Sequence, residues 1–136
     1  MAARRVSYVD IKAPNRAGQA AAVLKAVADA GISLQAFTGF PDGGGRSQLD
    51  LVTDDLAKLR KVAKANGWRL SPVKRGFLIQ GRDRVGAVQR QLAKLTRRGV
   101  NITAVDAVTA GRGRFGMILW VKPRDTAKAA RALGAH

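Results

Sequence analysis

The chain has 136 residues, enough for one ordinary domain or for two compact units of roughly 65 to 70 residues, each near the lower limit for an independent core. Its formal net charge is +16, from 25 basic and 9 acidic residues, and 46% of its residues are hydrophobic. No apolar run approaches the ~20 residues of a membrane span, so we expect a soluble, cytoplasmic protein without a membrane partner. The absence of cysteine excludes disulfides and thiolate chemistry.

A repeat of fixed length organises the chain. Gly18 and Gly86 stand 68 positions apart, and no gap is needed to extend the alignment. The same offset relates three further pairs, which are Gly31 and Gly99, Ile32 and Val100, and Leu34 and Ile102. An offset held over so many positions predicts two copies of one folding unit, residues 1–73 and 74–136.

The first copy reads as strand, helix, strand, strand, helix, strand. Alternating β-formers, helical spacing of apolar residues and turns rich in glycine or proline define these elements. We expect strands at 6–11, 32–40, 47–53 and 68–73, and helices at 19–30 and from residue 56 to Gly67. Pro72 suits the last strand to a sheet edge, because proline cannot donate to a sheet.

The second copy repeats this order from Gly76 but ends after its second helix. We expect strands at 76–79, 101–109 and 115–121, and helices that end at Gly99 and near Leu133. Its fourth strand is missing, so either residues 68–73 or a partner chain must complete the sheet edge. The predicted fold class is α+β: two tandem ferredoxin-like βαββαβ units, each an antiparallel sheet with both helices on one face.

The turn that leads from a strand into the first helix recurs in both copies, at 15–18 and at 83–86. A helix N-terminus has unpaired N–H groups and partial positive charge, which suit a carboxylate or phosphate. Glycine lets a ligand approach the backbone, and the side chain of Asn15 or Asp83 can bind a polar or amino group. The alternative is that these residues only cap the helix and turn the chain.

These residues resemble a known family. The chain resembles the ACT domain, the amino-acid-sensing module of enzymes such as phosphoglycerate dehydrogenase and aspartate kinase. The shared features are, in order, a strand, the motif N-R-x-G, a helix, a glycine followed by a polar strand start, and a hairpin. The resemblance covers nearly the whole chain as two tandem units. It implies a regulatory, non-enzymatic homodimer that binds a small amino acid or related carboxylate where ACT units meet. The implied ligand-binding residues are Asn15, Arg16, Ala17, Gly18 and Ser33 in the first copy and Asp83, Arg84, Val85, Gly86 and Asn101 in the second.

Residue types that perform catalysis or bind metals and cofactors are scarce in this chain. The only histidine is His136, and the chain has neither cysteine nor glutamate. Asp10 and Asp83 have no second acid at an informative spacing, so we expect no catalytic residues, no metal site and no cofactor. The G-x-G-x-x-G pattern at 111–116 precedes a strand instead of the helix that a dinucleotide site needs, which indicates a hairpin turn.

Nucleic-acid binding is the rival interpretation, since RNA-recognition modules share the predicted order of elements. They need aromatic residues on the central strands to stack on bases, and Phe115 lies at that position without the full basic-aromatic motif. The charge also favours it: residues 74–136 contain 14 basic and 3 acidic residues, enough for nonspecific binding to a polyanion. The same charges can serve simply as a solvated basic surface.

Overall fold

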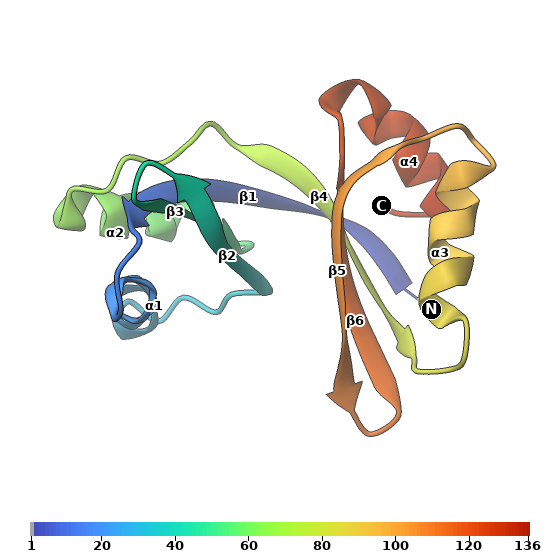
Figure 1. The fold of residues 1–136 in the computed structure, drawn as a ribbon, viewed down its shortest axis with the longest axis horizontal. Coiled ribbons are helices and arrows are strands. Elements are labelled where there is room, and N and C mark those ends of the chain that lie inside the picture. Colours follow the sequence, from blue (N-terminus) through green and yellow to red (C-terminus); the bar gives the residue numbers. More distant parts are fainter. Residues whose placement is uncertain (1) are drawn as a thin grey trace. The chain divides into compact units, whose positions relative to one another are not determined.

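The computed structural model describes residues 2–136, and these residues form two compact units (Figure 1). The N-terminal unit is Ser7–Lys74. The C-terminal unit contains Arg75–His136 together with the segment of the chain that ends at Val6. Both units are antiparallel sheets with two helices each, and the α+β prediction of tandem ferredoxin-like units is confirmed.

In the N-terminal unit the strands stand in the order β2-β3-β1, and neighbouring strands are antiparallel. The register places Val9 opposite Leu51 and Ile11 opposite Leu49. All four side chains are buried in one core cluster, because alternate residues of a strand share a face. The elements are β1 (Ala2–Pro14), α1 (Gln19–Asp29), β2 (Ala36–Gly43), β3 (Arg46–Val52) and α2 (Leu56–Asn66).

Helix α2 is specified by a capping residue at each end and by a buried apolar face. The carboxylate of Asp55 accepts a hydrogen bond from the backbone N–H of Lys58 at 3.1 Å, which caps the first turn. Gly67, with φ of 71°, ends the helix in the left-handed conformation that glycine adopts without strain. Between these ends, Leu59 and Val62 lie on the buried face. The predicted start, end and inner face of this helix are therefore confirmed.

In the C-terminal unit the strands stand in the order β1-β4-β6-β5. The pairs β4 with β6 and β5 with β6 are antiparallel. Among the described residues, no helix has the length and apolar character needed to cross a bilayer. The elements are β4 (Lys74–Arg82), α3 (Ala87–Thr96), β5 (Ile102–Gly111), β6 (Arg114–Val121), the 3₁₀ turn η1 (Pro123–Asp125) and α4 (Thr126–Leu133).

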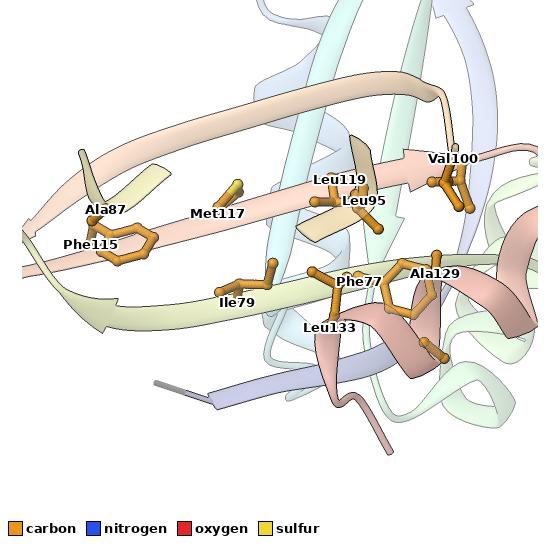
Figure 2. Close-up of a cluster of buried hydrophobic side chains, with 12 residues drawn as sticks. Phe77, Ile79, Ala87, Leu95, Val100, Phe115, Met117, Leu119, Ala129 and Leu133 are labelled. Atoms are coloured by element: carbon orange, nitrogen blue, oxygen red, sulfur yellow. The ribbon is translucent and has the colours of Figure 1, made fainter. Parts of the chain in front are cut away.

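The core of the C-terminal unit lies between its sheet and its helices. Figure 2 shows Phe77 and Ile79 of β4 near Met117 and Leu119 of β6, with Leu95 of α3 packed among them. Each of these side chains is at most 2% exposed. Burying such a side chain stabilises a fold by about 1.5–3 kcal/mol. The helices are thus fixed to one face of the sheet by the same period-two alternation as in the N-terminal unit.

The first residues of the chain supply the strand that the second copy lacks. The part of β1 that ends at Val6 belongs to the C-terminal unit, where β1 is the neighbour of β4. The backbone N–H of Arg5 also donates to the carbonyl of His136 at 3.1 Å. The sequence assigned this edge to residues 68–73 or to a partner chain. The strand β1 is instead longer than expected, and its N-terminal end pairs in the second unit.

Residues 68–73 do not form the predicted strand. Ser71 nevertheless lies beside β1: its backbone N–H donates to the carbonyl of Asp10, and its hydroxyl oxygen accepts from the N–H of Asp10, both at 2.9 Å. Pro72 has no N–H, so a regular ladder cannot continue. Trp68 and Leu70 pack against the core of the N-terminal unit. The segment therefore occupies the expected edge without the regular pairing of a strand.

Removing residues 2–5 should weaken the C-terminal unit selectively. The backbone groups of β4 that pair with β1 would be exposed to water, so their amides should exchange with solvent at least about tenfold faster. Hydrogen exchange followed by mass spectrometry measures this, with the amides of β3 in the N-terminal unit as the internal control. Unchanged protection of β4 would show that the first residues do not stabilise this edge.

Candidate functional site

The two strand-to-helix corners, 15–18 before α1 and 83–86 before α3, share one backbone conformation. Gly18 and Gly86 are the N-caps of these helices, with φ of 87° and 80°. This left-handed region strains any residue with a side chain, so both positions favour glycine. A Cβ added at Gly18 would meet no atom within 4 Å. The space beside this backbone is thus open to a ligand.

One main-chain hydrogen bond holds each corner to the hairpin turn of its own unit. The N–H of Asn15 donates to the carbonyl of Gly45, and the N–H of Asp83 donates to the carbonyl of Gly113, both at 2.8 Å. The two acceptors are also 68 positions apart. The repeat therefore preserves this long-range contact as well as the local turn.

The side chains of the corners are accessible. All eight residues at 15–18 and 83–86 are exposed, and Val85 is completely so. The hydroxyl of Ser47 donates to the amide oxygen of Asn15 at 3.1 Å, which orients the amide and leaves its NH₂ group outside this bond. An oriented NH₂ donor beside an open glycine can bind a carboxylate or another acceptor.

Ser33 and Asn101 do not lie at the corners of their own units. Both are exposed and follow the helix that begins at the corner, so a whole helix separates them from it. The 11 residues of α1 correspond to about 16 Å of helix length. The carbonyl of Ser33 accepts a hydrogen bond from the hydroxyl of Thr53 at 3.1 Å. Within each unit, the structure therefore separates these residues from the other predicted ligand contacts.

A pocket of about 570 Å³ lies next to the second corner, and sequence reasoning missed most of it. Four arginines line it, but only Arg84 was among the predicted site residues. The other three are Arg82 of β4, Arg90 of α3 and Arg114 of β6. A comparison of charges between the two copies at the 68-residue offset would have given a signal, because only the second copy has all four.

The N-terminal unit contains a polar cluster that was not predicted. Asp10 and Asp50 are directly opposite each other on β1 and β3, and they are only 7% and 5% exposed. The ammonium of Lys74 binds Asp10 and lies 5.4 Å from the centre of the Tyr8 ring. Asp10 thus has a second acid beside it, contrary to the sequence reading, because only the strand register brings the two carboxylates together.

Burial changes the titration of this polar cluster. It raises the pKa of Asp50, while a hydrogen bond from Gln48 and the charge of Lys74 oppose the shift. Burial also raises the pKa of Tyr8 to about 12, with help from the two carboxylates. The two buried carboxylates are thus only partly compensated by the positive charge of Lys74. Among residues 2–136, no group of His, Cys, Asp or Glu side chains could hold a metal ion.

Phe115, which the sequence placed at a base-stacking position, is only 3% exposed. Figure 2 shows it in the core with Ala87 at the start of α3. A buried ring cannot stack on a base, so this residue does not support RNA recognition. The preceding glycine-rich stretch connects β5 to β6, with Gly111 and Gly113 at positive φ. The predicted hairpin turn is therefore confirmed there.

These features define the class: tandem ferredoxin-like units with an exposed, glycine-containing corner before the first helix of each. Residues 7–65, within the N-terminal unit, match the ACT domain family, and for these residues the resemblance seen in the sequence is confirmed. Comparison with curated protein sequences gives no match.

Several solved structures are similar over nearly the whole chain. A protein from Bacteroides thetaiotaomicron is 20% identical with a TM-score of 0.81, over 97% of this chain and 88% of that one. The regulatory subunit of aspartate kinase from Thermus thermophilus is 17% identical with a TM-score of 0.66, over 96% of this chain and 91% of that one. The corresponding subunit from Thermus flavus is 20% identical with a TM-score of 0.58, over 98% and 95%. At these identities the similarity shows the fold.

Replacing Asp50 with asparagine should stabilise the protein at pH 7. Because the folded chain holds the Asp50 proton more tightly than the unfolded chain does, this group stabilises the fold fully below the ordinary aspartate pKa. That contribution is lost as the pH rises through the raised pKa. We expect Asp50→Asn to raise the unfolding midpoint at pH 7 by about 4 °C, an effect of order 1 kcal/mol.

Thermal unfolding between pH 4 and pH 8 measures this effect, and the gap between variant and parent should narrow toward pH 4. Asp106→Asn, on an exposed position of β5, controls for the change in net charge. A lower midpoint for Asp50→Asn at pH 7 would show that the hydrogen bond from Gln48 and the charge of Lys74 outweigh the cost of burial.

Proposed function

We propose that this chain is a cytoplasmic regulatory protein, not an enzyme, that binds a small amino acid or related carboxylate at its strand-to-helix corners. The observation that supports it most is the repeated corner itself. Gly18 and Gly86 adopt the same left-handed conformation, and each corner makes the same hydrogen bond to its hairpin turn. The ACT domain match at 7–65 and the similarity to aspartate kinase regulatory subunits favour the same class of function.

The chemistry of the corners fits the two ends of an amino acid. A helix N-terminus attracts the carboxylate, because its N–H groups are not all paired and its dipole is positive there. Neither α1 nor α3 has an acidic residue in its first turn or a side-chain cap that would compete for these groups. The carboxylate of Asp83 is available for the ammonium, and the NH₂ group of Asn15 is available for an acceptor oxygen of the ligand.

A second copy of the chain would complete the site. Ser33 and Asn101 each lie one helix length from the corner of their own unit. A single unit therefore cannot bring its corner and its Ser33 or Asn101 onto the same small ligand. If two copies pack with these helices antiparallel, the corner of one meets the strand start of the other. The exposed Val85 would then be covered at the interface. We therefore propose a homodimer with ligands at its seam.

Regulation would follow from a population shift. A ligand held between two copies favours the packing in which both sides of the seam contact it, by as much as its affinity differs between the packings. A protein that binds only one of these packings would then respond to the ligand. The corner itself need not move, since the main-chain bond to the hairpin turn holds it in place.

A thermal-shift screen against the twenty amino acids tests the proposal. A ligand present at a hundred times its dissociation constant should add ~2.7 kcal/mol to the free energy of unfolding. We expect one or a few amino acids to raise the unfolding midpoint and to stabilise a dimer in analytical ultracentrifugation. If none of the twenty changes either quantity, the amino-acid assignment is wrong.

Substitution of a corner glycine separates ligand binding from backbone strain. Gly18→Val places a branched side chain where the ligand should approach, so the affinity for the amino acid should fall at least about tenfold. Gly67→Val is the matched control, because Gly67 also has positive φ and free space but caps α2 away from the corner. Both variants bear a similar strain of roughly 1–2 kcal/mol. Equal ligand responses in the two would contradict the corner assignment.

Nonspecific binding to nucleic acid is a second candidate, favoured by the net charge of +16. Such binding is dominated by counterion release and weakens steeply with salt. Titration of an arbitrary single-stranded RNA at two salt concentrations distinguishes it. Tight binding with a steep salt dependence, combined with no response to amino acids, would favour this function over the amino-acid sensor.

A further inference from the structure

The arginine pocket of the C-terminal unit has an unusual arrangement of charge. Arg82 and Arg114 are directly opposite each other on the antiparallel strands β4 and β6. Directly opposite residues point to the same side of the sheet, and like charges in such a pair are destabilising. Arg84 from the corner and Arg90 from α3 line the same pocket. Four positive side chains from four parts of the unit therefore surround one space.

No carboxylate compensates these charges. Over residues 2–136, the structure shows no ion pair between any of the four arginines and an acidic side chain. Asp83 stands between Arg82 and Arg84 in the sequence, yet it does not line the pocket. Helix α3 likewise has no acidic residue in its first turn. The repulsion is thus left for solvent or a bound anion to relieve.

Part of the pocket is already held in place. One guanidinium nitrogen of Arg90 donates to the carbonyl of Val85 at 3.2 Å, which ties the side chain to the corner. A Cβ added at Gly86 would lie 3.1 Å from a nitrogen of Arg90, so glycine makes room for this guanidinium. An arginine that is fixed before a ligand arrives loses less conformational entropy when it binds.

The first copy shows that the fold itself does not require this charge. At the 68-residue offset, Arg82 corresponds to Pro14 and Arg90 to Ala22. The first copy also neutralises its own charge here, since Lys12 forms an ion pair with Asp42 at 2.6 Å. The second copy has Ala110 in place of that acid. The second copy also has Gln80 in place of Lys12, so the whole ion pair is absent there, and the extra positive charge of the second copy comes from Arg82 and Arg90.

We propose that this pocket binds a compact oxyanion with two or more negative charges and no ammonium group, such as a phosphate ester or a polycarboxylate. Guanidinium groups bind the oxygens of phosphate and carboxylate in a bidentate manner. The volume of about 570 Å³ is in the range of small-molecule sites. An amino acid fits poorly, because its ammonium would face four guanidinium groups with no carboxylate among the lining residues.

This site is independent of the proposed amino-acid function apart from Arg84. It adds, beside the second corner, a ligand of a different chemical class from the amino acid proposed for the two corners. The chain would then respond to two kinds of small molecule. The two proposals can fail separately, because Arg90 and Arg114 take no part in the proposed amino-acid contacts.

Isothermal titration of the full chain with pyrophosphate and with citrate tests the proposal, at an ionic strength kept constant with KCl. Arg114→Gln and Arg90→Gln should each weaken binding about tenfold or more, since each removes hydrogen bonds between charged groups. Arg46→Gln is the matched control: it removes the same charge at the position that corresponds to Arg114 in the first copy. Its affinity should equal that of the parent.

Binding of pyrophosphate or citrate that depends on Arg114 but not on Arg46 supports the proposal, and the preferred anion identifies the acid group. If Arg114→Gln and Arg46→Gln lower the affinity for the anion equally, binding depends on overall charge alone and the proposal is wrong. The proposal is also wrong if aspartate binds in the pocket as tightly as citrate, or if the parent chain binds neither anion. If neither anion binds and Arg114→Gln weakens only single-stranded RNA, the pocket recognises a nucleic-acid backbone instead.

Discussion

The hydrogen bond between each strand-to-helix corner and its hairpin turn is the constraint on which both units depend. In the first unit it joins Asn15 to Gly45, and in the second it joins Asp83 to Gly113. Each bond connects the end of one strand, the start of a helix and the turn between two other strands. The helix N-terminus and the hairpin turn are therefore held at the same end of the sheet, and any ligand at the corner meets a fixed backbone.

Because this constraint is formed by main-chain atoms, the side chains around it were free to diverge between the copies. The first copy places an ion pair, Lys12 with Asp42, near its hairpin. The second places Arg82 opposite Arg114 on equivalent strands and has no acid in the corresponding position. A duplicated backbone can thus support two sites with different electrostatic character, provided that the left-handed glycines and the bond to the turn are kept.

Acidic residues are few in this chain, and two of them are buried side by side in the N-terminal unit. Asp10 is compensated by Lys74, whereas the pKa of Asp50 is raised by its burial. Removing a charge from water is costly unless partners replace the solvent. The net charge of the surface is consequently even more basic than the composition suggests, which favours contacts with anions that weaken with salt.

The sequence by itself determined the duplication, the order of helices and strands, and the glycine-containing corners, because these depend on local spacing and on a repeated offset. The tertiary structure alone decided which segment completes the second sheet, why residues 68–73 form no strand, and that Asp10 faces Asp50. It also brought four arginines into one pocket. Each of these features joins residues that are distant in the chain, and their pairing depends on strand register and edge complementarity, which local periodicity does not encode.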